Sequence, residues 1–242
     1  MASQDSIHSF DYSQILGIPE VAVRIRLLHS RMQELRSSGG ILEVGLGAGD
    51  VTLMLSRAFV MTGRYKLTCV DADADNIGLV RRRLDAEHLP LPDFIYSKIE
   101  TANLGGPYSH LVLLGILEHL EYPVTVLERL RSVLAPEGHA HIVVNLANSL
   151  HRLLGVEMGQ IPAVEALAPS DYSLGHHRVY TLGELRSHVT KAGLIITQEI
   201  PFYLKPLPTS MLSPLPMELH MGLHRLGMRF PEFASYAYVE CC

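Results

Sequence analysis

Residues 41–50 read Ile-Leu-Glu-Val-Gly-Leu-Gly-Ala-Gly-Asp, and this stretch decides the fold. Its first four residues form a short, mainly apolar run that is typical of a buried strand. Glycines follow at positions 45, 47 and 49, and a helical pattern begins at Asp50. Glycines let a backbone approach a ligand closely, and the amino end of a helix offers free N–H groups to a negative group. The stretch therefore predicts a strand, a ligand-binding loop and a helix.

Strand-like and helix-like segments alternate on both sides of this loop. Residues 20–38 have apolar side chains at helical spacing, which predicts a helix with one buried stripe made of Val21, Ile25, Leu28, Met32 and Leu35. The alternation predicts an open, doubly wound α/β sheet whose ligands bind at the carboxyl ends of the strands. The predicted strands cover residues 41–44, 65–70, 94–99, 111–117, 139–145, 194–200 and 234–241. The helices between them cover residues 50–59, 74–87, 123–135 and 181–193.

The chain divides into an N-terminal tail and helix, residues 1–38, and one larger domain, residues 39–242. Two stretches of the larger domain are irregular: a lid segment, residues 146–180, and a cap insertion, residues 203–231. The cap insertion is rich in methionine and leucine. It has two interpretations: a helical cap that shields an apolar substrate or forms a homodimer face, and a helix at about 216–227 packed in the ordinary way against the sheet.

Composition and charge exclude several classes of protein. Hydrophobic residues make up 48% of the chain and charged residues 19%, which is typical of a folded domain. The net charge of −5 disfavours nucleic acid as a partner, because binding a polyanion depends on cationic groups. No apolar run reaches the roughly 18 residues of a membrane span, and the first residues lack the features of a secretory signal. We therefore expect a cytoplasmic protein that binds neither nucleic acid nor membranes.

Asp71, at the end of the second predicted strand, is a candidate ligand-binding residue. A carboxylate at this position can accept hydrogen bonds from both hydroxyls of a ribose. The alternative is that Asp71 caps a turn. Its place one strand after the glycine loop favours the ribose interpretation.

Four segments, in this order and spacing, are typical of one enzyme family. They are Glu43-Val44-Gly45-Leu46-Gly47-Ala48-Gly49, Val70-Asp71-Ala72, the run from Leu111 to Leu120, and Leu134-Ala135-Pro136-Glu137-Gly138. Over about residues 40–145 the chain thus resembles the class I S-adenosylmethionine-dependent methyltransferases. The resemblance implies a Rossmann-like sheet of seven strands, mostly parallel with the last strand antiparallel. It also implies S-adenosylmethionine as the cofactor and S-adenosylhomocysteine as the product.

The resemblance gives each matching position a role. The glycine loop holds the methionine part of the cofactor, the acid after strand two holds the ribose, and the segment after strand four faces the reacting methyl. Where the family often has an acid near the adenine, this chain has Ser97, so Ser97, Glu100 or the backbone holds the adenine amino group. The implied cofactor-binding residues are Glu43, Gly45, Gly47, Gly49, Asp71, Ala72, Ser97, Leu117 and Glu118.

A second motif lies in the lid segment. Residues 175–180, Gly-His-His-Arg-Val-Tyr, resemble a Gly-His-x-Arg-x-Tyr motif of small-molecule methyltransferases. A loop after strand five lies over the cofactor end of the sheet, so His151, Arg152, Arg178 and Tyr180 are candidate substrate-binding residues. An arginine offers a forked donor to a carboxylate or phosphate. The alternative is that Arg152 and Arg178 tie the lid segment to Asp171 and Glu165.

Methyl transfer from a sulfonium is an in-line displacement. The protein therefore aligns the reactants, and it supplies a general base where the acceptor must lose a proton. The candidate bases are His119, His176 and His177. Structural roles are the alternative. His119 could simply bond a backbone group, and one of His176 and His177 could be a scaffold or surface residue.

We expect no metal, because His139 and His141 share one face of strand five without a third ligand at a suitable spacing. The sequence predicts a methyltransferase that acts on an oxygen or nitrogen of a small metabolite, with secondary metabolism as one setting. One alternative is a non-catalytic adenosylmethionine-binding protein. The absence of the family's acid after strand three, the presence of Tyr108-Ser109-His110 where the family often has Asp at the start of strand four, and the methionine-rich cap insertion would suit it. Another is a nicotinamide-dependent oxidoreductase, which would share the glycine loop and Asp71.

Overall fold

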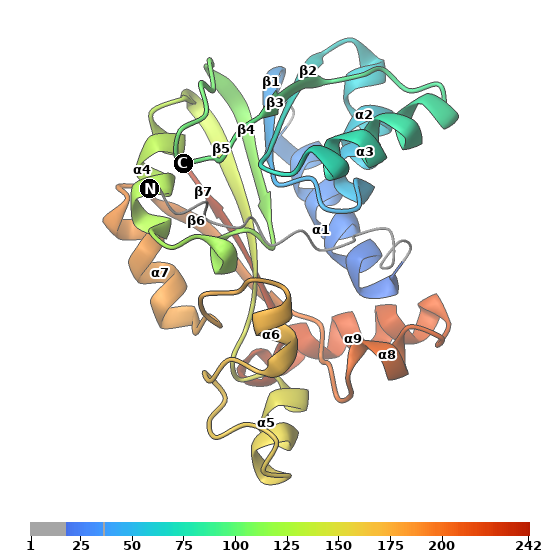
Figure 1. Ribbon diagram of the computed structural model, residues 1–242, viewed down its shortest axis with the longest axis vertical. Helices are drawn as coiled ribbons and strands as arrows, with labels where there is room; N and C mark the ends of the chain where they lie inside the picture. Colours follow the sequence, from blue (N-terminus) through green and yellow to red (C-terminus); the bar gives the residue numbers. More distant parts are fainter. Residues whose placement is uncertain (1–17, 36) are drawn as a thin grey trace, which may run out of the picture.

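The computed structural model describes residues 18–35 and 37–242, so the predicted N-terminal tail lies outside the described residues. Its strands are β1 (Gly39–Val44), β2 (Tyr65–Asp71), β3 (Asp93–Tyr96), β4 (Tyr108–Leu114), β5 (Leu134–Asn145), β6 (Ile196–Phe202) and β7 (Tyr236–Cys241). They form one seven-stranded sheet in the order β3-β2-β1-β4-β5-β7-β6 (Figure 1). Strands β1 to β5 pair in parallel, whereas β7 runs antiparallel to both β5 and β6. The predicted α/β sheet with an antiparallel last strand is confirmed.

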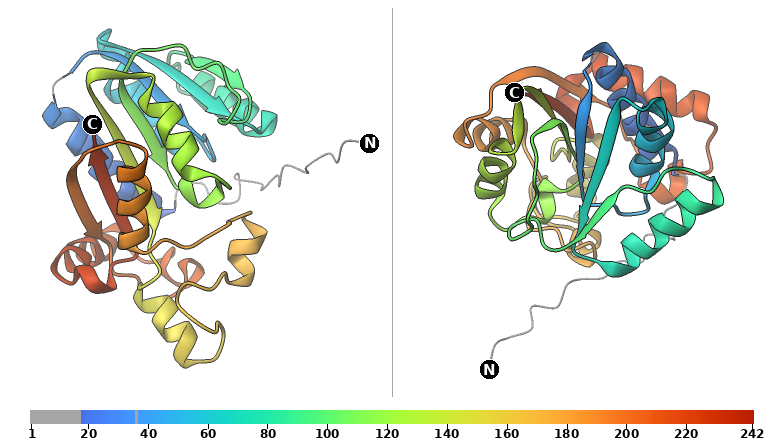
Figure 2. Two further views of the ribbon diagram at one scale, coloured as in Figure 1. Left: turned by 90° about the vertical axis from the view of Figure 1, so that its left-hand side faces the viewer. Right: turned by 90° about the horizontal axis from the view of Figure 1, so that it is seen from above.

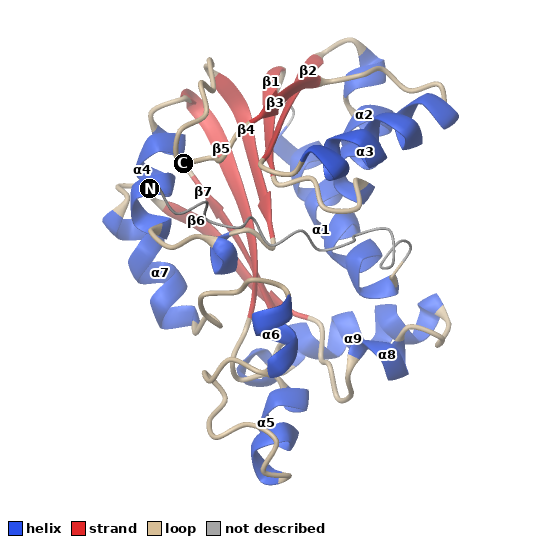
Figure 3. Cartoon of the chain, in the orientation of Figure 1, coloured by secondary structure: helices blue, strands red, loops and turns tan. Residues whose placement is uncertain are grey.

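Helices cover both faces of the sheet (Figure 3). One face carries α1 (Pro19–Leu35), α2 (Asp50–Ala58), α3 (Ala74–Ala86) and α9 (Met217–Arg229), and the other carries α4 (Pro123–Arg131) and α7 (Leu182–Lys191). Helices α4 and α7 lie side by side (Figure 2). Neighbouring β4 residues serve opposite cores, because Leu111 packs with Leu127 of α4 and Val112 packs on the α1 side.

The two irregular stretches gather at the carboxyl ends of the parallel strands (Figure 1). The lid segment contains α5 (Leu150–Glu157) and α6 (Pro169–Ser173), and the cap insertion contains α8 (Thr209–Leu212), α9 and the short η4 (Pro231–Phe233). Helix α9 contacts β6 and α1, yet Leu219, Leu226 and Met228 on it remain exposed. Within residues 18–35 and 37–242, no helix combines the length and the apolarity needed to cross a membrane.

Four strands differ clearly from their predicted limits: β3 ends at Tyr96, β6 covers Ile196–Phe202, and β4 and β5 differ for reasons that their residues give. Strand β4 ends at Leu114, because Gly115 takes a φ of +71° and residues 117–119 form the short helix η3 (Leu117–His119). Strand β5 begins at Leu134, so the predicted turn at residues 136–138 is an irregularity within the strand. Leu134 pairs with Tyr108 and His139 with His110, and the register shifts between these pairs.

The buried face predicted for α1 is partly wrong. Leu28 and Met32 are buried as expected, but Val21 and Ile25 are only half-buried, and Glu20 and Val23 are buried in their place. Helix α1 packs against both α2 and α9. The face that these two contacts bury is rotated relative to the apolar stripe that the sequence predicts. A charged residue therefore enters the interior.

A chain of buried polar groups joins α1 to the sheet. His110 Nδ1 bonds His141 Nε2 at 2.9 Å, and His141 Nδ1 bonds the Tyr238 hydroxyl at 2.7 Å. Tyr238 donates to Glu240 Oε2, which also accepts from Arg31 of α1 at 3.1 Å. Because Tyr238 gives its proton to Glu240, His141 donates from Nδ1 and accepts at Nε2. Burial lowers the pKa of His110 to about 4 and that of His141 further below its ordinary value, so both rings are neutral at pH 7.

The seat of α9 on the sheet depends on a glycine. A Cβ at Gly227 would lie 2.2 Å from the backbone nitrogen of Tyr203, which cannot move as a side chain could. We expect Gly227→Ala to lower the free energy of unfolding by about 1 to 3 kcal/mol, as overpacking does. Gly222→Ala, on the same helix, is the matched control, because nothing lies within 4 Å of its Cβ position. Urea denaturation measures both; equal stability of the two variants would contradict the packing.

Candidate functional site

The glycine loop lies between β1 and α2, where its backbone passes close to the segment after β4. Gly45, Gly47 and Gly49 have φ values of +76°, +50° and +86°, a region that glycine adopts without strain. A Cβ at Gly45 would lie 2.0 Å from Cδ1 of Ile116. Gly49 is the N-cap of α2, and a Cβ there would lie 2.6 Å from Val80. The glycines at 45 and 49 therefore permit contacts with the segment after β4 and with α3 that side chains would prevent.

Asp71 holds the glycine loop against β2. Its Oδ2 accepts from the Leu46 N–H at 2.6 Å, and its Oδ1 accepts from the Asp73 N–H at 2.8 Å. Burial raises the pKa of Asp71 above its ordinary value, and these two hydrogen bonds oppose the shift. Ser97 donates its backbone N–H to the Asp71 carbonyl at 3.0 Å. The predicted residues Asp71, Ala72 and Ser97 thus lie at one edge of the sheet, next to the loop.

Glu43 lies beneath the glycine loop, in the interior. Its carboxyl is 2% exposed and accepts from Cys69 Sγ at 3.5 Å. Burial raises the pKa of Glu43 to about 8, although the hydrogen bond from Cys69 opposes the shift. Glu43 is therefore mostly protonated at pH 7 and contacts Cys69 of β2 in the interior, whereas Asp71 contacts the loop itself through the Leu46 N–H.

The segment after β4 is the next part of the site. Leu117 and Glu118 are both buried in η3. Glu118 Oε1 accepts from Asn145 of β5 at 2.9 Å, whereas Oε2 has no hydrogen-bond partner among the described residues. Burial raises the pKa of Glu118 above its ordinary value, although His176 and Arg24 oppose the shift.

The lid segment is bound to this same segment by its predicted motif. His177 donates its backbone N–H to the Glu118 carbonyl at 2.8 Å, and Arg178 donates to the Leu120 carbonyl at 2.7 Å. The Tyr180 hydroxyl, fully buried, lies 3.5 Å from the Leu117 carbonyl and 3.2 Å from His188. The Arg178 guanidinium thus contacts backbone carbonyls. The side chain of His177 is exposed.

His119, His176 and Asp171 form a cluster below β4. The rings of His119 and His176 meet edge to face at 4.7 Å, and His176 Nδ1 bonds Asp171 Oδ1 at 3.2 Å. Burial, with the neighbouring His176 and His177, lowers the pKa of His119 to about 4. Burial alone would raise the pKa of Asp171, but His176, the Ala168 N–H and Arg152 hold it well below its ordinary value. Asp171 is therefore an ionised partner that can orient His176.

The two candidate residues of α5 have different surroundings. Arg152 is tied within the lid segment: Nη1 pairs with Asp171 at 3.0 Å, Nε donates to the Val164 carbonyl at 2.7 Å, and Nη2 donates to the Ala166 carbonyl. His151 lies beside Lys205, and its Nδ1 has no partner within the described part of the chain. Burial lowers the pKa of His151 to about 4, and Lys205 and Arg152 add to this, so its ring is neutral.

Sequence reasoning missed a second charged group beside the site, formed by α1 and the cap insertion. Lys205 Nζ pairs with Glu20 Oε2 at 3.2 Å, and the Tyr236 hydroxyl donates to the same oxygen at 2.5 Å. The Arg24 guanidinium lies 3.9 Å above the Tyr236 ring. Glu20 and Arg24 are one helical turn apart, and charges within the buried face of a helix are the pattern that would have found them.

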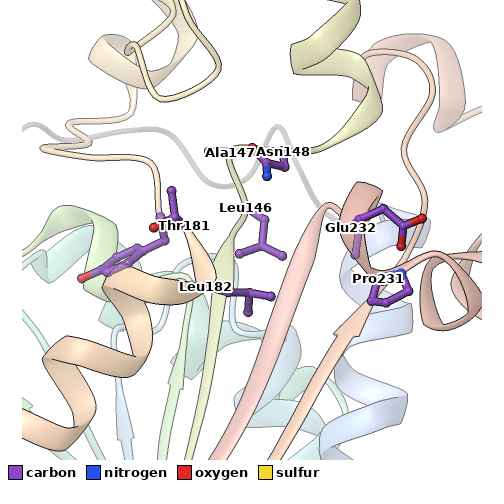
Figure 4. Close-up of a pocket in the computed structure, with 9 residues that line it drawn as sticks. Leu146, Ala147, Asn148, Thr181, Leu182, Pro231 and Glu232 are labelled. Carbon is purple, nitrogen blue, oxygen red and sulfur yellow. The ribbon is translucent and has the colours of Figure 1, made fainter.

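A small cavity of about 80 Å³ lies between the lid segment and the start of β7 (Figure 4). Leu146, Thr181 and Leu182 form one side of it, and Pro231 and Glu232 the other; Tyr180 also lines it. A larger, open depression of about 420 Å³ lies at the amino ends of the strands, around Gly39 and Tyr108. Neither of these two cavities includes a residue of the glycine loop.

The described residues contain no group of three or more His, Cys, Asp or Glu side chains that could hold a metal ion. His141 bonds His110 and Tyr238, and His139 Nδ1 lies 3.7 Å from Glu240. These two histidines of β5 thus contact a shared network of polar side chains.

Comparison with known proteins identifies a sequence family and a fold. Residues 20–199 match a family described as a methyltransferase domain. No curated protein sequence matches the chain. Among solved structures, a SAM-dependent methyltransferase from Aquifex aeolicus superposes with a TM-score of 0.63 at 14% identity, covering 96% of this chain and 98% of that one.

Two further solved structures have the same fold. The N-methyltransferase NodS from Bradyrhizobium japonicum, in complex with S-adenosylhomocysteine, superposes with a TM-score of 0.57 at 14% identity and covers 96% of this chain and 92% of its own. The plantazolicin methyltransferase BamL superposes with a TM-score of 0.60 at 16% identity, and the coverages are 97% and 88%. At these identities the likeness concerns the fold.

The buried carboxyl of Glu43 makes stability depend on pH. Its folded pKa of about 8 lies above the ordinary value of 4.5, so its contribution is present at low pH and is lost as the pH rises through 8. Relative to Glu43→Gln, the wild type should lose about 2 to 3 kcal/mol of unfolding free energy between pH 5 and pH 7. Urea denaturation at both pH values measures the difference. Glu100→Gln, at an exposed carboxyl, is the control, and the same pH dependence in both variants would refute the assignment.

Proposed function

The chain belongs to the methyltransferase domain family, and we propose that it transfers a methyl group from S-adenosylmethionine to an oxygen or nitrogen of a small-molecule metabolite. S-adenosylmethionine is the cofactor of this family, and S-adenosylhomocysteine is bound in NodS. The observation that carries the proposal is the junction of η3 with the lid segment. There, His176, with Asp171 behind it, meets His119 directly after β4.

The residues at the carboxyl edge fit the cofactor. A Cβ at Gly45 would lie 2.0 Å from Cδ1 of Ile116, so only glycine lets the loop pass this close to the segment after β4. Asp71 and Ser97 lie next to the loop, where a ribose and an adenine would extend along the edge. Gly45, Gly47, Gly49, Asp71, Ala72, Ser97 and Leu117 are the residues that would hold the cofactor. Glu43 would support the loop from below.

The bound cofactor supplies a methyl group on a positively charged sulfur. The protein's own residues then align the acceptor and accept its proton. We assign this base role to His176, because Asp171 is ionised and its Oδ1 accepts a hydrogen bond from Nδ1 of the ring. Nε2 is then the nitrogen that can take a proton from the acceptor. His119 is neutral and packs against this ring, which keeps a second positive charge away from it.

The small-molecule part of the proposal is supported by the lid segment and by two similar folds. Arg152 and Asp171 hold the lid segment together from within, and Arg178 fixes it to the end of β4. A segment held this closely over the carboxyl edge suits a small acceptor. NodS is an N-methyltransferase, and BamL was solved with an analogue of desmethyl plantazolicin.

We expect His176→Gln to lower kcat by roughly a hundredfold or more, as loss of a general base does, while the Kd for S-adenosylhomocysteine stays unchanged. Transfer of a radiolabelled methyl to a panel of small amines, phenols and carboxylic acids would identify an acceptor for the assay. His177→Gln, at an exposed side chain nearby, is the matched variant.

The split between kcat and KM separates a base from a structural residue. The loss in His176→Gln should fall on kcat with KM unchanged, and His177→Gln should keep both constants of the wild type. Equal rates for wild type and His176→Gln would refute the base assignment. Absence of methyl transfer to every acceptor, with S-adenosylmethionine bound, would contradict the proposed small-molecule activity.

A further inference from the structure

Helix α9 carries an apolar face that no other described residue covers. It lies at the lower edge of the molecule, below α1 (Figure 1). Leu219 is 41% exposed and Leu226 is 38% exposed. Each of them directly precedes a buried residue of α9, and one residue is a rotation of about 100° around the helix. Both leucines therefore point away from the side of α9 that packs against the protein.

The spacing of this face is typical of a helix that pairs with another helix. Leu219 and Leu226 are seven residues apart, so they lie in line along α9. Gly222 lies between them, and nothing is found within 4 Å of a Cβ built on it. The centre of the face is therefore open to a partner.

Exposed apolar side chains extend this surface beyond both ends of α9. Met211 and Leu215 precede the helix, and Phe230 and Phe233 follow it. A helix of 13 residues is about 20 Å long, whereas a stable interface buries roughly 800 Å² on each partner. The helix alone is short for that area, and these four side chains enlarge the surface. Together with Leu219 and Leu226 they form what we call the α9 face.

Two opposite charges lie along one flank of the α9 face. Glu218 and Arg225 are both exposed, and each directly precedes one of the two leucines. They are also seven residues apart, so they lie on the same flank of the helix. Among residues 18–35 and 37–242, neither forms an ion pair at 4.0 Å or less. Both charges are therefore available to a partner.

These charges match a second copy of the same helix in one direction. In an antiparallel pair of identical helices, the same flank of each helix meets that of the other. Glu218 then lies opposite Arg225 of the partner subunit, and two-fold symmetry forms this contact twice. In a parallel pair the charged flank would instead meet the flank that carries Leu223, and neither charge would be paired. The pattern thus complements its own antiparallel copy.

We propose that the α9 face is a homodimer interface, in which α9 packs antiparallel on α9 of a second copy around a two-fold axis near Gly222. Leu219 and Leu226 form the apolar centre of the contact, and Glu218 and Arg225 form ion pairs at its rim. The opposite side of α9 remains packed on β6 and α1 of its own chain. The dimer therefore uses only the side of the helix that the single chain leaves exposed.

Sedimentation equilibrium over a micromolar concentration series measures this dimer. We expect the wild type to approach twice the 26.8 kDa mass of one chain. Glu218→Arg and Arg225→Glu each place like charges opposite one another. Each should therefore raise the dissociation constant of the dimer by roughly tenfold to a hundredfold. Arg82→Glu, at an exposed position of α3, is the matched charge reversal and should leave this constant unchanged.

Mixing the two reversed variants tests the antiparallel direction. A chain with Glu218→Arg carries two bases on the flank, and a chain with Arg225→Glu carries two acids, so one chain of each kind forms both ion pairs. We expect the mixture to recover the dissociation constant of the wild type, whereas each variant alone dissociates. Both positions are exposed, and circular dichroism of each variant verifies that it is folded.

The proposal is overturned if the wild type stays monomeric throughout the series. It is also overturned if both reversals leave the dimer intact, because another face would then hold it. A mixture that stays as dissociated as its two components would refute the antiparallel contact. A monomeric chain that sediments with phosphatidylcholine vesicles would overturn the proposal too, because it would assign the α9 face to a lipid surface.

Discussion

The site depends on one close contact between backbone and side chain. Gly45 passes so near Ile116 that a Cβ would lie 2.0 Å from it, and this contact joins the glycine loop to the segment after β4. Asp71 fixes the loop from the other side through the Leu46 N–H. The carboxyl ends of β1, β2 and β4 therefore form one continuous edge. A ligand on that edge can reach the loop, Asp71 and η3 at the same time.

Helix α1 completes this edge from outside the sheet. Its first turns bring Glu20 and Arg24 to the carboxyl ends of the strands, and its last turns are held by Arg31 on Glu240. Glu240 in turn belongs to the buried chain through Tyr238, His141 and His110. Each group in that chain has a fixed donor and acceptor role. Directional hydrogen bonds therefore hold α1 on the sheet in addition to apolar packing.

Much of the fold could be predicted from local patterns. The glycine loop and the alternating segments predict the sheet correctly, because loop glycines and buried strands have strong local requirements. The errors concern features that depend on contacts between elements distant in sequence. The run after Leu114 is apolar enough for a strand, but Gly115 ends it, and the buried face of α1 follows its contacts with α2 and α9.

The site was predicted less completely than the fold. The location of Asp71 and of the loop glycines could be predicted, because they directly follow the first two strands of the sheet. The motif around His176 indicated that the lid segment contributes to the site. Sequence could not decide between two roles for Arg152, which in the structure bonds Asp171 and lid carbonyls. Arg24 lies in α1 and Lys205 in the loop after β6, both far from Glu118 in sequence. They were missed because only the folded chain brings Arg24 to Gly115 and Lys205 to Glu20.

We infer that the carboxyl edge around the glycine loop binds S-adenosylmethionine. Calorimetric titration of the wild-type chain with S-adenosylhomocysteine and with NAD, in parallel, tests it most directly. We expect micromolar binding of S-adenosylhomocysteine, in the range usual for small ligands, and none of NAD. Binding of NAD alone, or of neither compound, would contradict the account.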